Sequence, residues 1–335
     1  MERPKPLALP LAVLTYAALA LAADAQTFAG MIAYYVGQAK IIPILLAVCL
    51  PLAAMALRPR APIAMLAGLL RHGGLRLLLV TGLFCLGMAA FTTFKLSIPR
   101  FVPFYADAFF ADLDAWLHLG NPGEFLHAII PGWAQYPLGF LYGPVWFMLW
   151  FGLLAFVALH PDPAFRRRYF WTMALTICLL GTVAATAMSS VGPIFYADFV
   201  EPERFAPLMA AIQASAIGDY MNLASGYLLE SYQSGNGAAG TGISAMPSMH
   251  LAIVTLNACM LASLNRIAGL LAWTYVALIQ TGSVYLGWHY AVDGYFSIAA
   301  VSLIWWLCRQ KQQSRTMGPA LSSSILAEPI RQHSP

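Results

Sequence analysis

Long apolar segments separated by shorter polar ones dominate the chain. Segments long enough to cross a bilayer, which takes about 20 apolar residues per helix, fall near 7–23, 41–57, 77–94, 138–159, 169–189, 249–265, 268–287 and 290–308. Alternating strand patterns are missing from the sequence, and the edges of an open sheet could not find hydrogen-bond partners in lipid. The pattern predicts an all-α polytopic membrane bundle with six core spans and one or two N-terminal spans.

Composition supports a membrane protein. Of the 335 residues, 60% are hydrophobic and only 10% are charged. A soluble domain carries about 25% charged residues, and a disordered chain needs low hydrophobicity. These figures exclude a soluble globular enzyme and a disordered chain.

The distribution of positive charge predicts the orientation. Most of the 18 Lys and Arg residues flank one set of span ends, whereas the opposite set carries only Lys40, Lys95, Arg100 and Arg204. Short basic loops stay in the cytoplasm. We therefore expect a multi-pass protein of the inner (plasma) membrane, whose termini are both cytoplasmic if the first span is retained.

The spans divide the chain into three parts. Residues 1–76 would hold the N-terminal spans and a cytoplasmic loop, 77–308 the main membrane domain, and 309–335 a flexible cytoplasmic tail. Basic residues before the first apolar run and the sequence Ala23-Asp24-Ala25 are also typical of a cleaved signal. Residues 1–25 are thus either a signal or a retained span.

Two long loops, 95–137 and 190–247, are predicted to face outward and to contain interfacial helices. In the first loop apolar side chains recur at helical spacing opposite three aspartates. The apolar residues are Phe109, Phe110, Leu113, Trp116 and Leu117, and the acidic ones are Asp107, Asp112 and Asp114. Such an amphipathic helix lies in the outer interface or packs on the bundle.

A Gly- and Ser-rich segment, 240–250, precedes the sixth predicted span. Its Pro247 is expected in the first helical turn, where proline is favoured. The free N–H groups of that turn make an anion site, to which Ser248 and His250 add side-chain donors. The arrangement suits phosphate, although a capped helix with an interfacial histidine would have the same sequence.

His289 and Asp293 lie at the outer boundary of the last predicted span. Residues four apart share a face of a helix, and an aspartate bonded to one ring nitrogen leaves the other free as a nucleophile or base. A structural hydrogen bond is the alternative. The pair also matches two zinc ligands but lacks a third, so no metal is expected.

A third basic element, Lys95 to Pro103, follows the third predicted span. Lys95 and Arg100 in this proline-stiffened outer segment could clamp a phosphate. On this element alone, the favoured interpretation is that they anchor the chain to lipid headgroups.

Together these elements resemble the type 2 phosphatidic acid phosphatase superfamily, which carries K-x6-R-P, P-S-G-H and S-R-x5-H-x3-D. The matching residues are Lys95 and Pro103 for the first motif, Pro247, Ser248 and His250 for the second, and Ser283, His289 and Asp293 for the third. Their order, spacing and outward placement agree over roughly residues 80–308.

Three positions depart from these motifs. Val102 and Val284 replace arginines and Met249 replaces a glycine. The sequences A-M-P-S-x-H and H-Y-x-V-D, with Gly192-Pro193 before Phe195-Tyr196, look closer to the inositol phosphorylceramide synthase-like branch. Eukaryotic members of that branch move phosphoinositol between lipids.

The resemblance implies a role for each matched residue. His289 would form a phosphohistidine, Asp293 would orient it and His250 would protonate the leaving oxygen. Lys95, Ser248 and Ser283 would hold phosphoryl oxygens, and Arg100 could replace one lost guanidinium. The resemblance implies a phospholipid or lipid-phosphate substrate within the bilayer and no metal, other cofactor or nucleic acid. The oligomeric state is not indicated.

The missing arginines favour a particular substrate class. A phosphomonoester approaches a dianion and a phosphodiester is a monoanion, so losing charge-assisted bonds hurts the monoester more. We expect a diester or diphosphate substrate and head-group transfer, with hydrolysis open. The alternatives are a transporter or flippase that uses His and Asp as a proton relay, and a non-catalytic scaffold.

Overall fold

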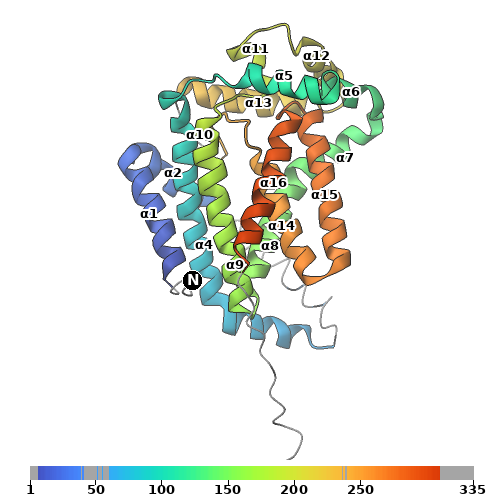
Figure 1. Cartoon of the computed structure of the whole chain (residues 1–335). Coiled ribbons are helices and arrows are strands. Elements are labelled where there is room, and N and C mark those ends of the chain that lie inside the picture. The colour runs from blue at the N-terminus through green and yellow to red at the C-terminus, as the bar shows by residue number, and fades with distance from the viewer. Residues whose placement is uncertain are drawn as a thin grey trace, which may run out of the picture.

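The computed structural model describes residues 7–38, 40, 51, 55, 60–235, 237 and 240–309. These residues form helices and turns with no strand among them, which confirms the all-α bundle (Figure 1). The predicted span at 41–57 and the tail after Arg309 lie almost entirely outside the described residues.

The predicted core spans are all present as apolar helices. Four are long enough to cross a membrane: Gly73–Phe101, Gly132–Leu159, Pro163–Ala187 and Arg266–Tyr285. Shorter apolar helices cover Ala8–Ala23, Met249–Leu264 and Ala291–Leu307. The chain is therefore an integral, multi-pass membrane protein.

The N-terminal helices α1 (Ala8–Ala23) and α2 (Ala25–Gln38) both pack against α4 (Pro62–Phe101). The sequence did not predict α2, whose small and polar residues hide its helical pattern. Its start is capped by Asp24, whose Oδ1 accepts a hydrogen bond from the Thr27 N–H at 3.0 Å.

Helix α4 corrects the prediction of an outer loop that begins at Lys95. The helix continues to Phe101 and contains Pro99. A proline removes the hydrogen bond from its own nitrogen and crowds the preceding turn. Because Pro99 lies in the last turn, this distortion falls where the helix ends. Lys95 and Arg100 thus belong to a helix end.

The next two spans are assembled from consecutive helical pieces. The first contains η1 (Gly132–Ala134), α7 (Gln135–Phe140), the π-helical η2 (Leu141–Val145) and α8 (Trp146–Leu159). The second contains α9 (Pro163–Leu175), the π-helical η3 (Thr176–Ala184) and α10 (Ala185–Ala187). Single π-turns inside helices are often found at functional sites.

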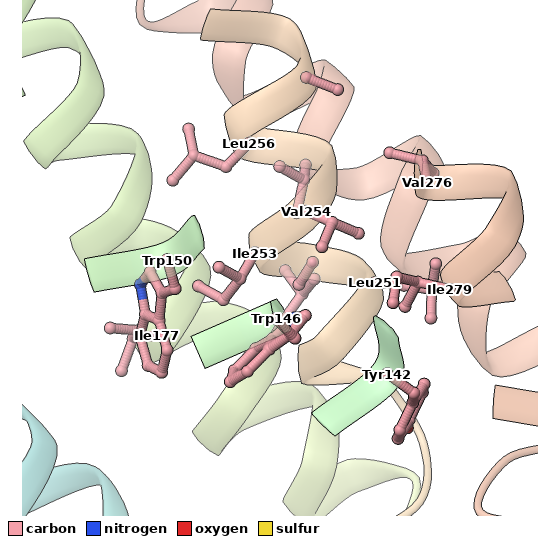
Figure 2. Packing of buried hydrophobic residues seen from close by; sticks show 14 of the residues in the cluster. Tyr142, Trp146, Trp150, Ile177, Leu251, Ile253, Val254, Leu256, Val276 and Ile279 are labelled. Atoms are coloured by element: carbon pink, nitrogen blue, oxygen red, sulfur yellow. The ribbon is translucent and has the colours of Figure 1, made fainter. Parts of the chain in front are cut away.

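The last three apolar helices are α14 (Met249–Leu264), α15 (Arg266–Tyr285) and α16 (Ala291–Leu307). Helix α14 packs against α8, α9, α15 and α16 and is buried along most of its length. Figure 2 shows its side chains Leu251, Ile253 and Val254 among residues of the neighbouring helices. This central helix carries the His250 motif at its start.

Short helices cover one end of the bundle (Figure 1). They are α5 (Asp107–His118), α6 (Pro122–Ile129), η4 (Pro193–Phe195), α11 (Tyr196–Phe199), α12 (Ala206–Ala214) and α13 (Gly218–Ser234). They come from the two long loops, as the sequence predicted.

The orientation of α5 differs from the predicted amphipathic face. Asp107 and Asp114 are buried, with 1% and 4% of their surface exposed, whereas Trp116 is 74% exposed. The two carboxylates point inward because backbone N–H groups at the end of the bundle need acceptors there. Helix α5 therefore packs on the bundle, which was the second of the two predicted arrangements.

Candidate active site

His289 and Asp293 form the predicted pair at the covered end of the bundle. His289 Nδ1 lies 3.3 Å from Asp293 Oδ2, and the pair is buried. The two residues do not share a helix, since α16 begins at Ala291. Instead, Asp293 reaches back over the helix start, where Oδ2 also accepts a hydrogen bond from the Tyr290 N–H at 3.1 Å. The contact at Nδ1 fixes the orientation of the histidine ring.

Ser283 shapes the turn that carries His289. Its carbonyl accepts hydrogen bonds from the N–H groups of Trp288 (3.1 Å) and His289 (3.3 Å). Its hydroxyl is buried and donates to the Gln280 carbonyl at 2.8 Å. The hydroxyl proton is therefore already used, and the structure gives Ser283 a place in the turn rather than a free donor.

Ser248 is the N-cap of α14. Its Oγ accepts a hydrogen bond from the Leu251 N–H at 3.4 Å, so its own proton stays available for donation. Pro247 precedes this cap. The prediction that Pro247 lies in the first helical turn is therefore wrong. The first N–H groups of a helix have no intrahelical partner, and here they belong to Met249 and His250.

His250 packs against two aromatic rings. Its ring stacks on Tyr142, with centroids 4.5 Å apart and planes 14° apart, and lies 4.3 Å from the Trp146 ring. Trp146 also donates from Nε1 to the His250 carbonyl at 3.2 Å. His289 and Lys95 both lie within electrostatic reach of His250. Sequence reasoning missed Tyr142 and Trp146, because aromatic residues in an apolar span are indistinguishable from core residues.

The two cations in the C-terminal part of α4, Lys95 and Arg100, lie in different places. Lys95 packs against the Gly242 loop, where a Cβ added to Gly242 would be 3.0 Å from Lys95 Cγ. Arg100 is exposed and pairs with Asp24 at 2.8 Å. The structure therefore brings Lys95, but not Arg100, to the group around His250.

The buried aspartates of α5 brace the His289 turn. Asp114 accepts hydrogen bonds from the N–H groups of Ala291 (2.7 Å) and Val292 (3.0 Å), which follow His289. Asp107 accepts one from the Tyr290 hydroxyl at 2.8 Å. Burial raises the pKa of both carboxyls above the ordinary value despite these bonds. The sequence carries no signal for this role.

The segment after α10 joins the two histidine motifs. The Ser190 carbonyl accepts a hydrogen bond from the Ala245 N–H at 2.9 Å, before His250 in the chain. The Ile194 N–H donates to the Gly287 carbonyl at 2.8 Å, before His289. Between them, the Gly192 N–H donates to Asp107 at 3.0 Å. The segment 190–194 therefore fixes the two motifs relative to each other.

A cavity of about 80 Å³ borders His289. Val284, which stands at an arginine position of the motif, lines this cavity together with Arg204 and Asp114. Arg204 pairs with the exposed Asp112 at 2.6 Å. The cavity leaves space for a polar group beside the histidine.

Comparison with known families identifies this arrangement. A family model described as the PAP2 superfamily matches residues 108–307. The chain belongs to the PAP2 superfamily. The part that matches this phosphatase superfamily runs from α5 to α16 and contains Ser248, His250, His289 and Asp293, whereas Lys95 and Arg100 precede it. No curated protein and no solved structure matches the chain. Membership and the apolar helical bundle make the protein a membrane phosphatase-type enzyme.

Proposed function

We propose that this PAP2 protein transfers a phosphoryl-linked head group between lipids at the outer membrane face, through a covalent intermediate on His289. The observation that carries the proposal is the buried His289–Asp293 contact of 3.3 Å within electrostatic reach of His250. A histidine held by a carboxylate at Nδ1 presents Nε2 as the nucleophile. The inositol phosphorylceramide synthase-like motifs favour transfer over hydrolysis.

The reaction would take place in two steps. In the first, the Nε2 lone pair of His289 forms a bond to phosphorus while the P–O bond to the diacylglycerol oxygen breaks. Protonated His250 gives its proton to that oxygen. In the second, a lipid hydroxyl or water attacks phosphorus, its proton passes to His250, and the N–P bond breaks. Asp293 would stabilise the charge on the His289 ring in both steps.

Phosphoryl oxygens would be held by Lys95, by the Ser248 hydroxyl and by the first N–H groups of α14. Preorganised donors of this kind stabilise charge that develops in the transition state. Arg100 and Ser283, both predicted to bind phosphate, are placed otherwise: one pairs with Asp24 and the other donates to Gln280. We therefore give them no direct contact with the substrate.

The charge of the site supports a phosphodiester substrate. Arg100 and Arg204 each have an acidic partner, whereas Lys95 takes part in none of the ion pairs that the described residues form. One unneutralised cation suits the single charge of a diester better than the near-double charge of a monoester. Phosphatidylinositol is the diester that the motif resemblance suggests.

Replacing the nucleophile tests the intermediate. We expect His289→Ala to abolish turnover of phosphatidylinositol and the trapping of labelled head group on the protein, because no other side chain can replace Nε2. His160→Ala is the matched control, since His160 follows α8 at the opposite end of the bundle. Full activity in His289→Ala would falsify the covalent mechanism.

The substrate class is tested by offering labelled phosphatidylinositol and phosphatidic acid in the same detergent micelles, with lipid alcohols or with water alone as acceptor. The proposal expects faster turnover of the diester and a labelled lipid product when the lipid alcohol is present. A clear preference for phosphatidic acid contradicts the diester assignment, and release of free head group with every acceptor contradicts transfer.

A further inference from the structure

Tyr142 contributes a polar atom that the mechanism above does not use. The residue lies in the π-helical η2, and its ring stacks on His250 at 4.5 Å. In Figure 2 it lies beside the start of α14, near Leu251 and Trp146. The ring and Trp146 together form an aromatic wall along one side of His250.

The hydroxyl of Tyr142 is buried without a partner. The side chain is 6% exposed, and its oxygen has no hydrogen-bond partner among the described residues. Two other buried or half-buried tyrosines differ in this respect: the hydroxyl of Tyr275 donates to the Leu141 carbonyl at 2.7 Å, and that of Tyr290 donates to Asp107. A buried polar group with no partner costs free energy unless a ligand or water satisfies it.

The surroundings of this hydroxyl point to the reacting group. Asp293 and Tyr220 both act on it electrostatically, the former more strongly, and Asp293 Oδ1 also has no partner in the described part of the chain. The ring therefore packs on His250, while the hydroxyl is coupled electrostatically to Asp293, the partner of His289, and bonds to neither. An O–H group at this point can donate to an oxygen placed between the two histidines.

We propose that the Tyr142 hydroxyl donates a hydrogen bond to a non-bridging oxygen of the phosphate ester as His289 attacks it. The inference rests on the proposed function and adds a substrate-contacting residue to it. The bond would replace a donor lost with the arginine at Val284. Tyr142 keeps its proton throughout, so the balance of the two steps is unchanged.

The test uses Tyr142→Phe, which keeps the ring and its stacking on His250 and removes only the hydroxyl. Hydrogen bonds to charged groups are strong enough that we expect kcat for phosphatidylinositol to fall about 10- to 100-fold. Inorganic orthovanadate, which mimics five-coordinate phosphorus, should bind more weakly by a similar factor in isothermal titration of the full chain in detergent.

The matched control is Tyr275→Phe, the same chemical change on a hydroxyl that bonds to the same π-helical segment. Removing a hydroxyl without a partner should leave the melting temperature of Tyr142→Phe equal to or above that of the unsubstituted protein. Removing the bonded one should lower the melting temperature of Tyr275→Phe while turnover and vanadate affinity stay the same. Opposite effects on activity and stability support the proposal.

Two results overturn the inference: turnover and vanadate affinity unchanged in Tyr142→Phe, or equal losses of activity in Tyr142→Phe and Tyr275→Phe. Both leave the proposed function intact as long as His289→Ala is inactive. Normal turnover in His289→Ala overturns the proposed function itself, whatever Tyr142→Phe does. The three variants together therefore separate the two failures.

Discussion

Gly192 illustrates how single residues position the candidate site. Its φ of +85° and ψ of 169° belong to a region that only glycine occupies readily. A Cβ at this position would lie 2.6 Å from the Trp288 carbonyl oxygen, next to His289. The backbone can approach this closely only because the side chain is missing. The Gly192-Pro193 sequence was visible beforehand, but its contact with the His289 turn was not.

We predict that Gly192→Ala destabilises the protein by at least about 2 kcal/mol and lowers turnover strongly, because backbone strain costs about 1–3 kcal/mol before the clash is counted. Gly240→Ala is the matched control: its φ is +70°, but nothing lies within 4 Å of the added Cβ. That variant should lose about 1–2 kcal/mol and keep its activity. Thermal unfolding in detergent and turnover measure both effects; equal losses in the two variants would show that the Trp288 contact is unimportant.

Tyr142 marks the limit of sequence reasoning at this scale. The ionisable residues His250, His289 and Asp293 stand out in apolar segments because burying them is costly. A tyrosine or tryptophan in the same segment has no such cost, because these residues occur both in cores and at membrane interfaces. The titratable part of the site could therefore be predicted, and its aromatic wall could not.

Among the secondary-structure elements, α5 determines how the His289 turn is held. Its aspartates 107 and 114 are two helical turns apart and point to the same side, which places both carboxylates over the end of the bundle. Asp114 accepts the N–H groups of Ala291 and Val292 at the start of α16. The helix that follows His289 is therefore capped by a residue far away in the chain.

We predict that Asp114→Ala costs about 1–3 kcal/mol, the usual penalty for buried N–H groups that lose their acceptor. Turnover should fall at least tenfold, because the start of α16 also holds Asp293 against His289. Asp112→Ala, on the exposed face of the same helix, removes only the ion pair with Arg204 and should cost less than about 1 kcal/mol. Unfolding and turnover are compared in parallel; similar effects in both variants would mean that α5 does not position the site.

The elements differ in how well the sequence predicts them. The core spans were predicted because the bilayer demands about 20 apolar residues at each crossing, and this demand is local. The inward face of α5 was not, because its reason lies in N–H groups 177 and 178 positions away. Helix α2 and the extension of α4 past Lys95 were missed for a related reason: packing between α1, α2 and α4 stabilises helix where the local pattern is weak.

For the whole molecule, the candidate site is concentrated at one end. The end of α4 and the starts of α14 and α16 meet beneath α5 and the other covering helices (Figure 1). The chain crosses the bundle between these elements, so residues nearly 200 positions apart reach the same end. This clustering could be predicted from the sequence, because consecutive spans cross the membrane in opposite directions. The distances within the site could not be predicted in this way, because they depend on the segment 190–194, which connects the two histidine motifs.

The orientation of the bundle gives the last prediction. Arg166, Arg167 and Arg168 lie in the first turns of α9, at the end away from the site, and basic span ends of this kind stay in the cytoplasm. A cysteine at the exposed Glu203, beside the site, should react with a membrane-impermeant maleimide in intact cells. A cysteine at the exposed Ser263, at the other end of α14, should react only after permeabilisation. The unsubstituted chain gives the background, since Cys85, Cys178 and Cys259 lie within apolar helices and Cys308 is the C-cap of α16. The reverse labelling pattern would place His289 on the cytoplasmic side and rule out a reaction at the outer face.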